Sequence, residues 1–132
     1  MTGVGVLGGC KFIDNVTIDL NHTWTGDIAL FLIAPDGTFI ELSSSNGGPG
    51  DNYANTVFTD SAPLNIVSGA PPYTGSFNPE GRQNTTITPP YPFPGTPGTF
   101  TFQNTFDGIN ADGTWLLYLN DFVGGDVGFL NS

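Results

Sequence analysis

Hydrophobic and polar residues alternate along much of the chain with the period of two that is typical of β-strands. From Phe12 onward, Val16, Ile18 and Leu20 fall on one face, which predicts a half-buried strand. Residues 28–33 are apolar on both faces, as expected of a strand that is covered on both sides. No window places apolar residues at helical spacing, so the pattern predicts an all-β chain.

A tight turn is predicted to join the fully apolar strand to a returning strand at residues 38–42. Its sequence is Ala34-Pro35-Asp36-Gly37, in which proline presets φ at the second position and glycine is tolerated at the fourth. Further strands are predicted within residues 58–67, with a break at Pro63, at 100–102, at 114–119 and from 127 onward. About eight short strands at this spacing predict a single-domain antiparallel β-sandwich of jelly-roll type.

The chain is expected to divide into a short N-terminal segment and one domain. Residues 1–11, which begin with alternating glycine and valine, are predicted to be flexible or to be exchanged with another chain. Residues 12–132 form the sandwich and include a Pro/Thr-rich insertion at residues 82–99. Tyr91 and Phe93 lie among its prolines, and two interpretations stay open: an exposed binding lip, or a loop that packs over one end of the sandwich.

The charge balance excludes two classes of partner. The 132 residues include twelve acidic side chains against Lys11 and Arg82, which gives a net charge of −10. Phosphate groups repel such a chain, so we expect no binding to nucleic acid or to an anionic membrane surface. No apolar run approaches the length of a membrane span, and Cys10, as the only cysteine, allows no internal disulfide.

Five motifs in a fixed order carry a family resemblance. They are residues 22–60 with the Gly50-Asp51-Asn52-Tyr53 loop, Gly69-Ala-Pro-Pro-Tyr-Thr-Gly75, Phe77-Asn-Pro-Glu-Gly81, Asp112-Gly-Thr-Trp115 and Gly125-Asp-Val-Gly-Phe-Leu-Asn-Ser132. From about Asp14 to the end, the chain resembles the P domain (P/Homo B domain) of subtilisin-like proprotein convertases and secreted bacterial proteases. The final Trp-Ser-Leu strand of that family is missing from this sequence.

The resemblance implies a secreted or cell-surface module that stabilises or regulates a protease catalytic domain and has no catalytic residues of its own. We therefore expect that the chain is not an enzyme. The residues agree, because no Gly-x-Ser-x-Gly elbow accompanies the serines at 43–45. His22, the only histidine, is expected to have a structural role at a strand end.

Calcium is the cofactor that the acidic residues favour. Ten of the twelve acids are Asp, several beside Gly or Asn, and Ca²⁺ takes about six to eight oxygen ligands from carboxylates, amides and backbone carbonyls. The predicted ligands are Asp27, Asp51, Asn52 and Asp60, with Asp121 and Asp126 as a second candidate site. The alternative is that these side chains cap turns.

Two other functions stay open. Without its final strand, a sandwich exposes unpaired backbone groups, which a strand from another copy of the chain could fill. The chain would then be an extracellular structural or adhesive subunit that assembles by strand exchange, with residues 1–9 as the candidate donor. The third possibility is a calcium-dependent carbohydrate-binding module, whose partner would be a glycan.

Overall fold

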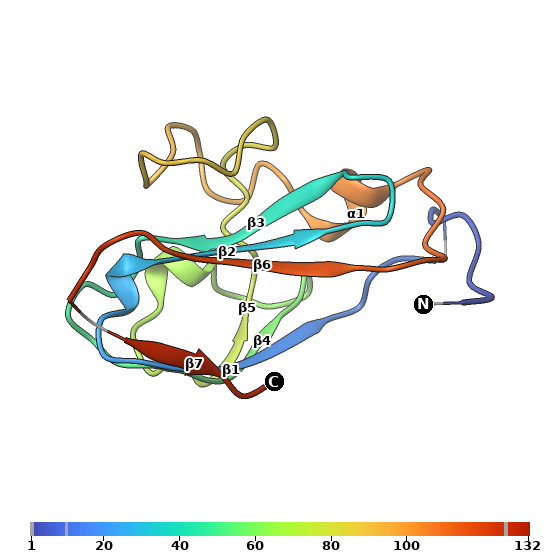
Figure 1. Ribbon diagram of the computed structural model, residues 1–132. Coiled ribbons are helices and arrows are strands. Elements are labelled where there is room, and N and C mark those ends of the chain that lie inside the picture. The colour runs from blue at the N-terminus through green and yellow to red at the C-terminus, as the bar shows by residue number, and fades with distance from the viewer. Residues whose placement is uncertain (1, 10, 126) are drawn as a thin grey trace.

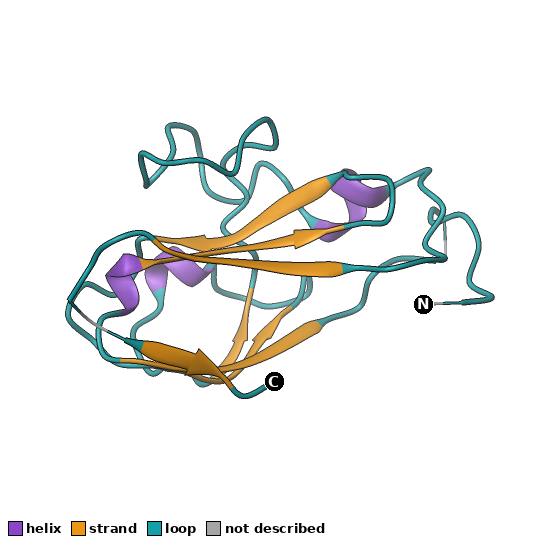
Figure 2. Cartoon of the chain, viewed as in Figure 1, coloured by secondary structure: helices purple, strands orange, loops and turns teal. Residues whose placement is uncertain are grey.

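Two β-sheets lie face to face in this computed structural model, which describes residues 2–9, 11–125 and 127–132 (Figure 1). The strands are β1 Val16–His22, β2 Ile28–Ile33, β3 Phe39–Ser44, β4 Tyr53–Phe58, β5 Gly75–Phe77, β6 Leu116–Asp121 and β7 Gly128–Leu130. Short helical segments are η1 Thr25–Asp27, η2 Ile66–Ser68 and α1 Phe102–Phe106. Figure 2 shows how little of the chain is helical. The prediction of an all-β sandwich is confirmed.

One sheet has the strand order β5-β4-β1-β7 and the other has the order β3-β2-β6. All pairs are antiparallel except β4 with β5. The predicted hairpin of β2 and β3 is confirmed, with Ile33 opposite Phe39. The Ala34 N–H donates to the Thr38 carbonyl at 2.7 Å and closes the turn.

Strand β2 is covered on both faces, as its sequence predicts. Ile28, Leu30 and Leu32 point into the main core between the sheets. Ala29 and Phe31 point to the opposite face, because successive side chains of a strand alternate. There they belong to a second apolar cluster outside the sandwich.

The Pro/Thr-rich segment 82–99 supplies the cover for this outer face. Phe93 is 5% exposed and its ring centroid lies 6.1 Å from that of Phe31. Tyr91 packs against Phe93 at 5.0 Å and against Phe122 at 4.8 Å. The interpretation of an exposed aromatic lip is therefore wrong. The segment packs on the sandwich, over the outer face of the β3-β2-β6 sheet (Figure 1).

The prediction of a strand at residues 100–102 is wrong, because helix α1 begins at Phe102. Thr101 caps the helix: its hydroxyl accepts from the Asn104 N–H at 3.1 Å, and the Asn104 side chain accepts from the Thr101 N–H at 2.7 Å. Phe102 and Phe106, four residues apart, lie on one helix face and are buried in the main core. Alternating Thr and Phe resembles a strand, but the capping residues and the core contact favour a helical turn.

The strand predicted within residues 58–67 is displaced toward the N-terminus. Strand β4 ends at Phe58, and the chain then turns before the short helix η2. The Asn65 side chain caps η2 by accepting from the Val67 N–H at 3.2 Å. The strand therefore precedes the break at Pro63 by several residues.

The described part of the N-terminal segment lies against its own chain. The Leu7 N–H donates to the Ile109 carbonyl at 2.8 Å, and the Ala111 N–H donates to the Gly5 carbonyl at 2.8 Å. Leu7 is buried in the main core. Cys10 lies outside the described residues. This segment thus pairs with the loop that precedes β6.

Candidate functional site

A cleft opens between the two sheets along the side where β6 and β7 are the edge strands. Its volume is about 300 Å³. The lining is mainly apolar and consists of Leu20, His22, Ile28, Leu119, Asp121, Gly128, Phe129 and Leu130. A second cavity of about 160 Å³ involves the other ends of β1 and β2, lined by Ile13, Asn15, Val16, Leu32 and Trp115. We call the larger opening the β6/β7 cleft.

Apolar side chains are exposed around this cleft. Leu130 pairs with Leu20 of β1 and therefore faces the space between the sheets, yet it is 46% exposed. Phe129 beside it pairs with the exposed Asn21, so its ring lies on the opposite face of β7, where it is 67% exposed. In the described part of the chain, no strand pairs with the outer edge of β6 or of β7. Exposed apolar groups at two free strand edges are typical of a surface that binds another polypeptide.

His22 and Asp121 close one end of the cleft and connect the two sheets. His22 comes from β1 and Asp121 from β6, and Nε2 of the imidazole lies 2.8 Å from Oδ2 of the carboxylate. His22 Nδ1 accepts from the Trp24 N–H at 3.1 Å, so the proton of the neutral ring is on Nε2 and is donated to Asp121. Because both ring nitrogens are engaged, His22 offers no free nitrogen to act as a base on a substrate.

Glycine is required where β7 passes His22. A Cβ atom at Gly128 would lie 2.0 Å from the Asn21 carbonyl oxygen and 2.7 Å from His22 Cδ2. Any side chain there would push β7 away from β1. This close approach explains the glycine in the Gly125-Asp-Val-Gly-Phe-Leu motif and aligns β7 at the mouth of the cleft.

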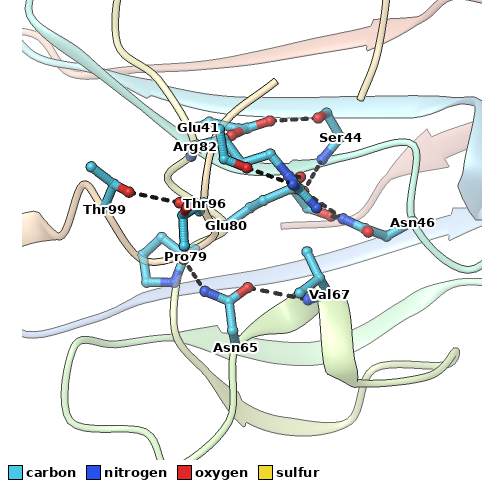
Figure 3. Close-up of polar contacts among 12 residues, drawn as sticks. Glu41, Ser44, Asn46, Asn65, Val67, Pro79, Glu80, Arg82, Thr96 and Thr99 are labelled. Carbon is cyan, nitrogen blue, oxygen red and sulfur yellow. Dashed lines mark hydrogen bonds and ion pairs between the residues drawn. The ribbon is translucent and has the colours of Figure 1, made fainter. Parts of the chain in front are cut away.

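A second polar centre lies beside β3 of the β3-β2-β6 sheet, where the carboxyl groups of Glu41 and Glu80 are fully buried. Figure 3 shows their polar contacts. Glu80 accepts from the Ser44 N–H at 2.9 Å and from the Asn46 side chain at 2.6 Å, and its other oxygen accepts from Arg82 Nε at 2.7 Å. Glu41 accepts from the Arg82 N–H at 2.9 Å and from the Ser44 hydroxyl at 2.5 Å. We call these residues the Glu41–Glu80–Arg82 cluster.

Burial perturbs the acidity of this cluster. Burial, and to a smaller extent the neighbouring Glu80 carboxylate, raise the pKa of Glu41 to about 7, against the lowering effect of the hydrogen bond from Ser44. Arg82 also donates to the Gly95 carbonyl at 2.9 Å, so the cluster is connected to the Pro/Thr-rich segment. The arrangement holds chain segments together and offers no opening to a substrate.

The predicted calcium ligands are not brought to one place. Asn52 precedes β4 and Asp60 follows it, so a strand of about 16–20 Å separates them. Asp60 accepts from the backbone N–H groups of Phe102 and Gln103, both at 2.9 Å, at the start of α1. This carboxylate therefore caps a helix.

The other predicted ligands lie near the opposite end of the sandwich. Asp27 is 7% exposed at the end of η1, Asp51 is exposed, and the Asn52 side-chain oxygen accepts from the His22 N–H at 2.9 Å. Asp121 belongs to the pair with His22, and Asp126 lies outside the described residues. No group of three or more His, Cys, Asp or Glu side chains in residues 2–9, 11–125 and 127–132 is arranged to hold a metal ion.

The sequence did not predict that the residues of either polar centre contact one another. The sequence predicts Asp121 only as a metal ligand and His22 only as a structural residue at a strand end, because residues 99 positions apart give no local sign of contact. Glu41 carried a usable signal, since it is an acid within the otherwise apolar start of β3. Glu80 and Arg82 flank the glycine of the Pro-Glu-Gly motif. In the sequence this motif supports only the family resemblance and does not indicate a buried ion pair.

Comparison with known proteins supports the resemblance over part of the chain. Residues 14–69 match the family described as the proprotein convertase P-domain. A relative, leupeptin-inactivating enzyme 1 of Streptomyces exfoliatus, is 35% identical over 69 residues. These residues are 52% of this chain and 16% of the relative's length, so the chain corresponds to a small part of that protein. The resemblance to the P domain is thereby confirmed.

No solved structure matches the chain. None of the helices in the described part of the chain has the length and hydropathy needed to cross a bilayer.

Proposed function

We propose that this chain is a non-catalytic, extracellular module that packs against the catalytic domain of a protease and stabilises or regulates it. The observation that carries the proposal is the β6/β7 cleft, an apolar opening between two free strand edges. The match of residues 14–69 to the proprotein convertase P-domain gives the class of partner. The engagement of both His22 nitrogens supports the non-catalytic part.

The partner surface that fits the cleft is an extended segment of the protease domain. Its backbone would pair with the free edge of β6, and alternate apolar side chains would enter the cleft beside Leu119 and Leu130. The net charge of −10 favours a partner with basic residues around that segment and opposes pairing with a second copy of this chain. The favoured partner is therefore a protease domain rather than a second copy of this chain.

Binding should depend on the exposed side chain of Leu130, which faces the cleft. The probe is leupeptin-inactivating enzyme 1 from which the segment matching this chain has been deleted, and the measurement is isothermal titration calorimetry. We expect micromolar binding that Leu130→Asp weakens on the order of tenfold or more, because a carboxylate would be buried at the interface. Leu64→Asp is the matched control, since Leu64 is an exposed apolar residue outside the lining of the cleft.

Two outcomes would contradict the docking model. One is an absence of heat change at high protein concentration, and the other is equal weakening by Leu130→Asp and Leu64→Asp. Analytical ultracentrifugation of the chain alone tests the alternative, which is self-assembly by strand exchange. A dimer or filament that Leu130→Asp dissolves would favour the structural or adhesive subunit instead.

We also propose a calcium site that excludes Asp60 and is made by Asp27, Asp51, Asn52 and the Gly47–Gly50 loop. The support for this site comes from the surroundings of Thr25. The Thr25 hydroxyl is fully buried, and its oxygen has no hydrogen-bond partner among the described atoms. This hydroxyl lies against Gly47, since a Cβ there would be 2.2 Å from it. Oxygen ligands in a glycine-rich loop are what Ca²⁺ prefers.

Calcium should then raise the melting temperature, and EDTA should lower it. A dissociation constant of roughly 10⁻⁴ M, typical of extracellular modules, gives about 2.7 kcal/mol of stabilisation at a hundredfold excess. Differential scanning calorimetry of the wild type, Asp51→Asn and Asp60→Asn tests this. Only Asp51→Asn should lose the response. Identical melting in EDTA and in saturating calcium, or loss of the response in Asp60→Asn alone, would remove this site.

A further inference from the structure

The edge of β3 that does not pair with β2 is covered by residues 80–82. The Glu80 N–H donates to the Leu42 carbonyl at 2.9 Å, and the Gly81 N–H donates to the Glu41 carbonyl at 3.1 Å. On the far side of these residues, the N–H groups of Gly98 and Phe100 donate to the carbonyls of Glu80 and Gly81. Both ends of the Pro/Thr-rich segment, residues 82–99, are thus held at the β3 edge.

Glu41 lies beneath this segment. It pairs with Phe31 of β2, and directly opposed residues of an antiparallel pair share a face. Phe31 belongs to the outer cluster that Phe93 and Tyr91 cover. The Glu41 carboxyl group is therefore on the outer face of the sheet, at the point where Arg82 leads into the covering segment.

The charges within the cluster do not balance. Glu41 and Glu80 supply two carboxyl groups, and Arg82 is the single cation that faces them among the described residues. Lys11, the other basic residue of the chain, donates to the Val4 carbonyl outside the cluster. The remaining groups are neutral: the Ser44 hydroxyl, the Asn46 amide, and the hydroxyls of Tyr53, Tyr73 and Tyr91, whose pKa values are raised chiefly by burial.

We propose that the Glu41–Glu80–Arg82 cluster is a pH-responsive latch that holds the Pro/Thr-rich segment on the sheet when Glu41 is protonated and loosens it when Glu41 is ionised. With Glu41 neutral, one carboxylate and one guanidinium compensate each other. With Glu41 ionised, the buried cluster has an excess negative charge, which is relieved if the segment moves aside and water enters. In the closed state the Ser44 hydroxyl donates to the Glu41 carboxyl group at 2.5 Å.

The direction of the pH dependence follows from the burial of Glu41. The pKa of this carboxyl is raised from its usual 4.5 to about 7 in the folded chain. A raised carboxyl pKa means that the closed arrangement is fully favoured below about pH 4.5 and loses that advantage as the pH rises through about 7. Opening would expose Phe31 and Phe93, an aromatic surface that is covered in the closed state.

Amide hydrogen exchange by mass spectrometry measures this opening directly. We expect the protection of residues 82–99, corrected for the intrinsic pH dependence of exchange, to fall on the order of tenfold or more between pH 5 and pH 8 in the wild type. In Glu41→Gln the same segment should show a constant protection. Asp36→Asn is the control, because Asp36 is an exposed acid in the β2–β3 turn whose amide can still accept from the Thr38 N–H.

A second measurement uses the wild type alone and stands even if Glu41→Gln does not fold. The ¹³C shift of the Glu41 carboxyl carbon, followed by NMR, should titrate with a midpoint near pH 7. Protection of the segment should fall over the same pH range. The latch is rejected if Glu41 titrates below pH 5, if protection of residues 82–99 is constant from pH 5 to pH 8, or if the loss persists unchanged in Glu41→Gln.

Discussion

Replacing Glu80 with alanine is expected to destabilise the fold by about 3–5 kcal/mol, the range for removing one partner of a buried ion pair. The change leaves the Arg82 guanidinium, the Ser44 N–H and the Asn46 amide without their shared acceptor. A small domain has only about 5–15 kcal/mol of stability, so this loss is a large part of the total.

Urea unfolding at pH 6, followed by tryptophan fluorescence, measures the effect of Glu80→Ala as a lower midpoint at constant slope. Glu80→Gln is the matched control. Its amide oxygen can still accept from the Ser44 N–H but leaves Arg82 without a counter-charge, so a smaller loss of about 1–3 kcal/mol is expected. If Glu80→Ala costs less than about 1 kcal/mol, the cluster is not a main support of the fold.

Replacing Gly81 with alanine is the second change with a large expected effect. Gly81 has φ of 55°, in the left-handed region, and a Cβ there would lie 2.0 Å from the Phe100 carbonyl oxygen. The backbone strain costs about 1–2 kcal/mol. The clash with backbone adds about 1–3 kcal/mol, because residues 98–100 must shift away from the β3 edge. We expect a total loss of about 2–5 kcal/mol in the same urea measurement.

Gly48→Ala separates the clash from the strain. Gly48 has φ of 51°, nearly that of Gly81, but a Cβ there would have no heavy atom within 4 Å. Its loss should therefore be limited to about 1–2 kcal/mol. Equal effects of the two substitutions would mean that the contact between Gly81 and Phe100 does not hold residues 98–100 in place.

The sandwich itself was largely predictable from sequence because its strands are defined by local patterns. The period-two alternation through Val16, Ile18 and Leu20 describes β1, and the continuous apolar run at residues 28–33 predicts the covered strand β2. The Pro-Asp turn predicts the hairpin with β3. Each of these signals lies within a few residues, so no knowledge of distant contacts is needed.

The wrong predictions concern segments whose local sequence pattern fits more than one structure. The Thr99 to Phe102 stretch alternates like a strand, yet α1 forms because Asp60, 42 residues earlier, accepts from its first N–H groups. The sequence predicts Asp60 as a calcium ligand because it is an Asp at a strand end within a motif of the family resemblance. A short carboxylate in a loop serves a cap or an ion equally well, and only the neighbour decides which.

The sequence by itself determined the all-β class, the hairpin, the resemblance to the P domain and the excess of acidic residues. The tertiary structure alone decided which of those acids are isolated and which are paired. His22 meets Asp121, and Glu41 meets Glu80 and Arg82, only because strands far apart in the chain are brought side by side. Burial and charge at such contacts depend on three-dimensional distance, which a one-dimensional pattern does not contain.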